Sequence, residues 1–492
     1  MESSSRYGPV LDKYLDMGGL QLRNLKSISH PSPIARSPSR EEIRQAILQL
    51  SDPEKVTYLT FETILSLENT EACSDLELLL SHSAKDSLPA CFRLASAYCQ
   101  GSRLMFDHAY GFLCVKVIAL LVQVAMLSRS GYIDRLIELL TLGHAEQSIF
   151  AAFTTTVYSL MVDAMDDHLD SGPSARHERF GWDHGSIGGA KPCLPEIGGC
   201  TTGEIQILLS QLWNSRAGFL VCGSRGREAL FPGFGGFLCW IWCGVAQQYG
   251  FPGQNQNSAS AWTQLVDLST RFTLYSSDRE ADLMSFVLLG CPEYARIAPI
   301  LDKSSSAVDA QDRTRIAIMT PKKIRSGEDL PLRFVTTLFC FACPSVDYQE
   351  NIFDIFSAKI DRMWFEFDRL AIRTEERLQA VANDLPFFCQ GFLHVLKVIQ
   401  YRDPELFFRL LSGIGEDLYE GIGRVILLPL SSKTLKAGKS SDNLKLLLDN
   451  TSYYVSSALG VTQDVIAVED ANKRTGCYPG TLISFSVRHV LL

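Results

Sequence analysis

Apolar side chains in this chain of 492 residues recur mainly at steps of three and four, the spacing of one face of an α-helix. Regular alternation of apolar and polar residues, which is typical of half-buried strands, is sparse. The clearest stripe lies within 346–372, where Arg362 and Glu366 are also spaced to pair at i, i+4. The stripe consists of Ile352, Phe356, Ile360, Met363, Phe367 and Leu370. The pattern predicts an all-α protein.

The helical segments are joined by short loops, and this arrangement is typical of stacked antiparallel helices. We expect either an irregular helical repeat of the HEAT or armadillo kind or a multi-helix bundle, in one body or in two lobes. No tetratricopeptide or ankyrin consensus is present. The predicted helices are 41–50, 53–68, 74–82, 87–100, 107–142 with a break near Gly131, 144–168, 203–217, 234–249, 260–276, 279–302, 328–342, 346–372, 374–383, 387–402, 404–412, 416–428 and, within the C-terminal end, 443–492.

Composition along the chain divides it into four parts. Residues 1–39 are rich in Ser, Pro and Arg and are predicted to be a disordered tail. Residues 40–168 form an N-terminal helical region and 204–492 a C-terminal one, with 303–327 and 431–441 expected to be linkers. Between the two regions, 169–203 is a long loop dense in Gly and Pro, of a length that is either functional or disordered.

Two kinds of helix start can be recognised. Ser39 precedes a helical stripe with Glu42 three residues later, which predicts a capping box. The tripeptide Asp-Pro-Glu occurs at 52–54 and again at 403–405. Asp is a favoured N-cap, and Pro fits the first turn, so both copies are predicted to begin helices.

Residues 110–127 and 234–249 are the most apolar stretches. The first contains Lys116 and Gln123, and the second is shorter than the roughly 20 apolar residues that a membrane span needs. We therefore expect both to be buried core helices, with no stable membrane span.

The charge balance is acidic, with 46 Lys and Arg against 55 Asp and Glu and a formal net charge of −9. An acidic body repels phosphate backbones, so we expect no nucleic-acid partner. The 14 cysteines mostly lie inside apolar runs, and the first residues, MESSSR, precede no apolar signal segment. These features favour free thiols in a soluble protein of the cytoplasm or nucleus. The pairs Cys340/Cys343 and Cys239/Cys243 are accordingly interpreted as core thiols.

Asp166, Asp167 and Asp170 form an Asp-Asp-x-x-Asp pattern at the end of an apolar helix. Carboxylates one helical turn apart can hold Mg²⁺ bridged to a diphosphate. The segment resembles the aspartate-rich motif of class I terpene synthases and prenyltransferases, and this resemblance implies magnesium-dependent ionisation of a prenyl diphosphate. That family has a second metal motif, whose nearest counterpart is Asn383-Asp384-Leu385. This chain has Phe387 and Gly391 where the motif has Ser and Glu.

The long loop also contains ligand types that zinc prefers, next to Asp183. They are His168, His177, His184, Cys193 and Cys200. Their spacings are wider than those of zinc knuckles, so a metal site and a loop without metal both stay open.

Searches for a P-loop, an HExxH zinc motif, a GxSxG nucleophile elbow and an EF-hand loop find nothing. We therefore expect a non-catalytic helical scaffold that binds another protein, without a cofactor. The alternative is the Mg²⁺-dependent prenyl-diphosphate enzyme that uses Asp166, Asp167 and Asp170.

Overall fold

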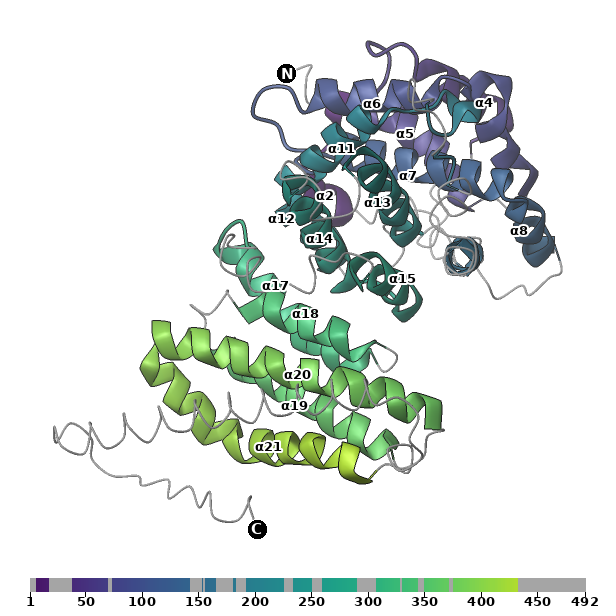
Figure 1. The fold of residues 1–492 in the computed structure, drawn as a ribbon. Coiled ribbons are helices and arrows are strands. Elements are labelled where there is room, and N and C mark those ends of the chain that lie inside the picture. The colour runs from purple at the N-terminus through teal and green to yellow at the C-terminus, as the bar shows by residue number, and fades with distance from the viewer. Residues whose placement is uncertain are drawn as a thin grey trace, which may run out of the picture. The chain divides into compact units, whose positions relative to one another are not determined.

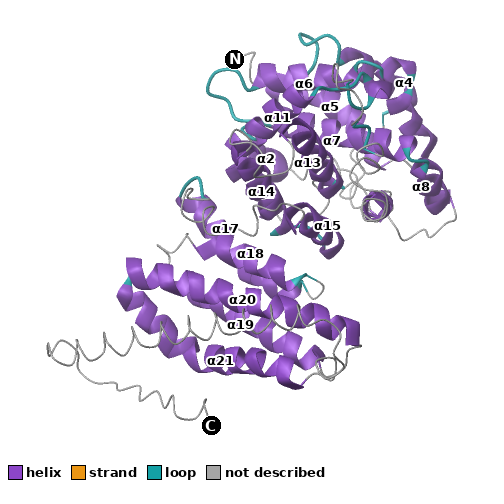
Figure 2. Cartoon of the chain, in the orientation of Figure 1, coloured by secondary structure: helices purple, strands orange, loops and turns teal. Residues whose placement is uncertain are grey.

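The computed structural model confirms an all-α protein, and helices make up nearly all of the described chain (Figures 1 and 2). It describes residues 6–16, 38–69, 73–141, 153, 155–164, 180–182, 192–224, 233–249, 259–289, 307–327, 330–343, 349–370 and 375–431. Within these ranges no strand occurs, and only two isolated β-bridges form, Val10–His108 and Cys193–Cys200. The chain divides into unit 1, Met1–Arg296, and unit 2, Ile297–Leu492. The segment 169–203 therefore falls inside unit 1.

Unit 1 is built around α7 (Ala109–Arg129), whose side chains are apolar on almost every face. A helix of this kind must be covered on all sides, and α7 contacts α5, α6, α8 and α13. Unit 1 also contains α2 (Leu11–Asp16), α4 (Arg40–Gln49), α5 (Tyr58–Leu65), α6 (Ser87–Tyr98), α8 (Tyr132–Thr141), α11 (Thr202–Asn214), α12 (Arg216–Ser224), α13 (Phe234–Tyr249), α14 (Ala259–Thr273) and α15 (Asp278–Leu289). Residues 155–164 are helical as well. Short 3₁₀ turns lie at Ser66–Asn69, Cys73–Leu80, His82–Ala84 and Pro195–Ile197.

By length and composition, α7 is also long and apolar enough to cross a membrane. In this fold, however, 89% of its most apolar window is buried among other helices, as in the core of a globular protein. The break predicted near Gly131 is confirmed. Ser130 caps α7, Gly131 has a left-handed φ of 71°, and α8 begins at Tyr132.

The capping box at the start of α4 is confirmed, with the Ser39 N–H donating to Glu42 Oε2 at 2.6 Å and the Glu42 N–H donating to Ser39 Oγ at 3.3 Å. The helix start predicted at Asp52 is wrong. Residues 52–55 form a turn in which the Asp52 carboxylate pairs with Lys55 at 2.7 Å, and α5 begins only at Tyr58. Val56 is fully buried behind this turn, so core packing overrides the local helix signal. The second copy does begin a helix, α21 (Pro404–Ser431), capped by Asp403.

The predicted disordered tail 1–39 needs a correction for residues 6–16, which fold against unit 1. Arg6 donates to the carbonyl oxygens of Pro53 and Val56 in the α4–α5 turn. Buried Tyr14 on α2 donates its hydroxyl to Glu62 Oε1 at 2.9 Å. Arg6 and Tyr14 thus anchor a segment whose average composition is polar.

Unit 2 contains α17 (Ala310–Ser326), α18 (Leu332–Ala342), α19 (Gln349–Leu370), α20 (Glu375–Arg402) and α21, which pack against one another (Figure 1). The linker predicted over 303–327 is wrong where it covers α17. Asp309 caps this helix through a 2.8 Å bond from the Asp312 N–H, and Ile316, Thr320 and Ile324 are buried at helical spacing. The polar residues around this narrow stripe, with Pro321, had suggested a linker.

The stripe predicted within 346–372 is confirmed at Ile352, Phe356, Ile360 and Met363, all of which are buried on α19. The Arg362–Glu366 pair is also confirmed, at 2.8 Å and fully inside the fold. Arg362 in addition donates to the backbone oxygens of Gly327 and Leu330, so it fastens the end of α17 to α19. Helices α20 and α21 each run through a break that the sequence had predicted, near 384–386 and near 413–415.

Candidate functional site

The most unusual group in unit 2 is the amine of Lys359, which lies on the apolar face of α19 between Phe356 and Met363 and is fully buried. Among the described residues, its Nζ has no hydrogen-bond partner. Buried ammonium groups are normally paired, because desolvation strongly disfavours a charge without a counter-ion. An amine left in this state requires a physical or functional explanation.

Three phenylalanine rings enclose Lys359 Nζ, and we call Lys359 with these rings the lysine cage. Nζ lies 4.1 Å from the centroid of Phe339 on α18, and 4.6 and 4.2 Å from those of Phe388 and Phe392 on α20. Phe339 and Phe392 also contact each other, with centroids 5.3 Å apart. Ring faces attract a cation, so they replace part of the hydration that the amine loses.

The cage is closed by a glycine. A Cβ built on Gly391 would lie 2.7 Å from Lys359 Nζ and 2.6 Å from Thr336 Cγ2, so no larger residue fits there without a shift. The titratable groups acting on the amine are the thiols of Cys340, Cys343 and Cys389, which are all free and buried.

Burial lowers the pKa of Lys359 to about 8, although the nearby thiols oppose this effect. The same burial raises the pKa of Cys340 to about 11 and that of Cys389 to about 12. The cage therefore raises the neutral fraction of the amine near pH 7 and keeps the surrounding thiols neutral. A desolvated lysine of this kind is more nucleophilic near neutral pH than an exposed one.

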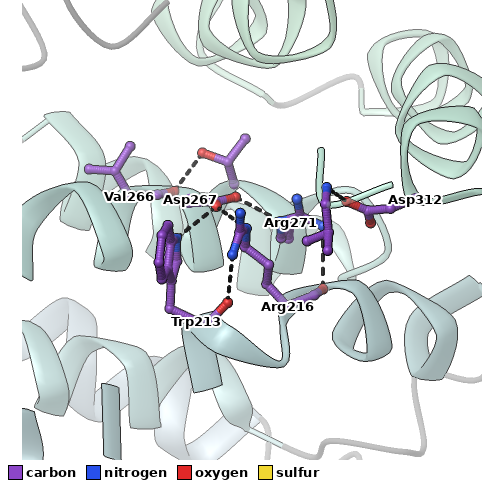
Figure 3. Close-up of polar contacts among 8 residues, drawn as sticks. Trp213, Arg216, Val266, Asp267, Arg271 and Asp312 are labelled. Atoms are coloured by element: carbon purple, nitrogen blue, oxygen red, sulfur yellow. Dashed lines mark hydrogen bonds and ion pairs between the residues drawn. The ribbon is translucent and has the colours of Figure 1, made fainter. Parts of the chain in front are cut away.

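Unit 1 contains a different buried polar cluster, around Asp267 on α14 (Figure 3). Its carboxylate accepts from Arg271 Nε at 2.7 Å and from Trp213 Nε1 at 3.0 Å, and lies 3.1 Å from Arg216 Nε. Burial raises the pKa of Asp267, and the two guanidinium groups oppose that rise. The guanidinium of Arg216 also stacks on Trp213, 4.0 Å from its centroid. These contacts tie α11, α12 and α14 together and leave the carboxylate engaged, which makes the role of the cluster structural.

The third feature is a set of exposed aliphatic side chains on segments that contact one another. Val10, Leu48, Leu59 and Leu104, which we call the apolar quartet, are each 43–50% exposed. Leu48 and Leu59 flank the α4–α5 turn, which Arg6 binds, and Val10 forms a β-bridge with His108, four residues after Leu104. Exposed charged side chains, including Glu54 and Lys55, lie on the same turn. Apolar residues within a polar rim are typical of protein-binding surfaces.

The residues of the predicted magnesium motif, Asp166, Asp167 and Asp170, lie outside the described residues. So do His168, His177, Asp183 and His184 of the predicted zinc set. In the partial second motif, the Asp384 carboxylate accepts from Arg333 Nε at 2.6 Å, so it takes part in an ion pair between α20 and α18. No three His, Cys, Asp or Glu side chains within the described ranges are grouped as metal ligands.

Cys193 and Cys200 are brought together by the structure. Their backbones exchange two hydrogen bonds of 2.8 and 2.9 Å. The Cys193 thiol donates to the Phe180 carbonyl oxygen at 3.3 Å and accepts from Trp240 Nε1 at 3.3 Å. Burial raises the pKa of Cys200 well above its usual value. Both thiols are buried in the core, and that of Cys193 contacts Trp240.

The cysteines of the two close pairs are buried thiols and none of the four forms a disulfide, as interpreted from the sequence. Sequence reasoning did not identify Lys359. A signal was available, because Lys359 lies three residues after Phe356 and four before Met363, on the stripe itself. What the stripe could not show was that rings from two other helices meet around the amine.

Comparison with known proteins adds no family. No family model matches the chain, and no curated protein or solved structure is significantly similar to it.

Proposed function

We propose that this protein is a helical scaffold that binds another protein through the apolar quartet of unit 1. The observation that supports the proposal is the exposure of Val10, Leu48, Leu59 and Leu104 on adjoining segments of a fold whose other apolar residues are mostly buried. Apolar side chains gathered at the surface typically mark interaction sites.

The polar chemistry of the described residues is consistent with this role. Asp267 contacts Arg216 and Trp213 on other helices, and Arg362 connects α19 to the end of α17. Asp384 on α20 pairs with Arg333 on α18. Such contacts stiffen a framework and do not expose reactive groups to a substrate. A rigid framework reduces the entropy lost on binding.

The test uses the full chain with a photo-crosslinking amino acid at position 59, or at 318 as a matched control. Ile318 on α17 is 43% exposed, which is close to the exposure of the quartet. We expect a protein partner to crosslink at position 59 and not at 318. With that partner purified, Leu59→Asp is expected to weaken binding by about tenfold or more, while Ile318→Asp leaves it unchanged.

Recovery of only further copies of this chain at position 59, or equal losses for both variants, would overturn the scaffold proposal. The enzymatic alternative has its own readout. Protection of the chain against thermal unfolding by inorganic pyrophosphate that depends on Mg²⁺, and is lost in Asp166→Asn, would support the prenyl-diphosphate enzyme instead.

A further inference from the structure

We propose that Lys359 is a covalent binding site for small apolar aldehydes, which form an imine with its amine inside the lysine cage. This site is independent of the apolar quartet and lies in the other unit. The proposal rests on the aromatic rings and thiols that surround the amine, and on the absence of a hydrogen-bond partner for Nζ among the described residues.

The amine is available in the form that attacks a carbonyl. Only a neutral amine has a free electron pair, and burial lowers the pKa of Lys359 to about 8. At pH 7, about one in ten of these side chains is therefore neutral, against about one in three thousand for an ordinary lysine. Among the described residues, no ion pair or hydrogen bond has to be broken before Nζ can react.

The cage selects the ligand by polarity and shape. The rings of Phe339, Phe388 and Phe392 favour a flat apolar group, which can stack against them. The groups acting on the pKa of the amine are thiols, and within the described part of the chain no guanidinium or second ammonium acts on it that could hold a phosphate or carboxylate. Apolar walls also exclude water, which protects an imine from hydrolysis.

The reaction needs no oxidant or reductant. The electron pair of Nζ forms a bond to the carbonyl carbon, while the pair of the C=O double bond moves to oxygen. Transfer of an amine proton to that oxygen gives a carbinolamine. Loss of water, with the second amine proton, leaves the C=N bond, so amine and aldehyde yield imine and one water. Because Lys359 is enclosed and a methyl group at Gly391 would already lie 2.7 Å from Nζ, the aldehyde enters and its ring is accommodated only when α18 and α20 move apart locally.

Trapping by reduction tests the proposal. The folded full-length protein is incubated at pH 7 with benzaldehyde and cyanoborohydride, which converts the imine into a stable secondary amine, and labelled peptides are mapped by mass spectrometry. We expect Lys359 to be benzylated at least tenfold faster than Lys397, an exposed lysine on the same helix as Gly391. Pyridoxal phosphate, a polar and anionic aldehyde, is expected to show no such preference.

Two variants distinguish imine formation at Lys359 from the general reactivity of lysine side chains. Lys359→Met should lose the rapid label and keep the slow labelling of Lys397, and circular dichroism verifies that it is folded. Gly391→Ala keeps the amine but places a methyl group beside Nζ, and it should slow labelling of Lys359. Labelling of Lys359 no faster than Lys397 in the folded wild-type protein would refute the covalent site, as would equal preference for pyridoxal phosphate.

Discussion

Lys359 and Asp267 represent two ways of burying a charged group. Asp267 is surrounded by donors, so its desolvation is offset by ionic hydrogen bonds from Arg271 and Trp213. Among the described residues, Lys359 has ring faces and thiols around its amine, and burial shifts the amine toward its neutral form. The ionic hydrogen bonds of Asp267 stabilise the native state. The burial of Lys359 reduces the stability of the native state at every pH at which the amine is protonated.

Replacing Lys359 with Met should stabilise the protein at pH 7. The substitution removes a buried charge without a counter-ion and keeps a similar shape, and such changes contribute about 1–4 kcal/mol. Urea unfolding of wild-type and variant protein measures the difference. A variant less stable than wild type would show that the ring contacts to the ammonium outweigh its desolvation.

The same pair of proteins should differ in pH dependence. The pKa of Lys359 is lowered to about 8 in the folded state, from 10.5 in the unfolded chain. Between pH 8 and 10.5 the unfolded chain binds more protons at this site, so the Lys359 contribution to stability rises with pH. The raised pKa of Cys340 and Cys389 acts in the opposite direction in both proteins. The advantage of Lys359→Met should therefore shrink as the pH rises from 8 to 10.5, and an advantage independent of pH would contradict the lowered pKa.

Replacing Asp267 with Asn should cost about 3–5 kcal/mol, because it leaves the guanidinium of buried Arg271 without its counter-ion. Asp361→Asn provides the control, since Asp361 pairs with Arg325 at the exposed surface, where such pairs contribute less than about 1 kcal/mol. Urea unfolding measures both losses. Similar losses in the two variants would show that burial adds nothing to the Asp267 cluster.

At the scale of elements, sequence periodicity predicted the all-α class, the α19 stripe, the α4 capping box and the break after α7. Periodicity failed to predict helix boundaries that depend on tertiary packing. The same Asp-Pro-Glu tripeptide is a turn before α5 and a helix start in α21, because Val56 has to reach the core after the first copy. Helix α17 was missed because its buried stripe is narrow and most of its surface is polar. The lysine cage combines three helices, and no local window contains that information.

Substitutions at two glycines test the backbone conformation at the end of α7 and at the start of α11. Gly131 ends α7 with a left-handed φ of 71° and open space at its Cβ position, so Gly131→Ala should cost about 1 kcal/mol through backbone strain alone. Gly203 lies in the first turn of α11, where an added Cβ meets only ordinary contact at 3.9 Å. Gly203→Ala should therefore be neutral or stabilising by up to about 1 kcal/mol. Chemical denaturation measures the free energy of unfolding of both variants. Equal destabilisation by the two substitutions would contradict the different backbone conformations of Gly131 and Gly203.

At the scale of the whole molecule, the two units have separate cores. The apolar quartet and the Asp267 cluster belong to unit 1, and the lysine cage lies wholly in unit 2. The sequence analysis placed its main division at 169–203, because Gly and Pro are dense there. The contacts divide the chain at 296–297 instead, shortly before the linker predicted at 303–327.

Each unit should fold when it is produced alone. Fragments 1–296 and 297–492 are expected to show helical circular dichroism and cooperative thermal unfolding, since each has its own buried core. Lys359→Met should raise the melting temperature of the second fragment as it does that of the full chain. A fragment that stays unfolded would show that the units depend on each other for stability.

The position of α7 in the chain has a consequence for synthesis on the ribosome. Helices α5 and α6 precede α7, but α13, which also covers it, is complete only at Tyr249, about 120 residues after Arg129. At about 5–20 residues per second, the nascent chain carries a partly uncovered apolar helix for roughly 6–24 s. During that interval α7 can be bound by chaperones that recognise exposed apolar segments. The yield of folded protein should therefore depend on the concentration of these chaperones in the cell.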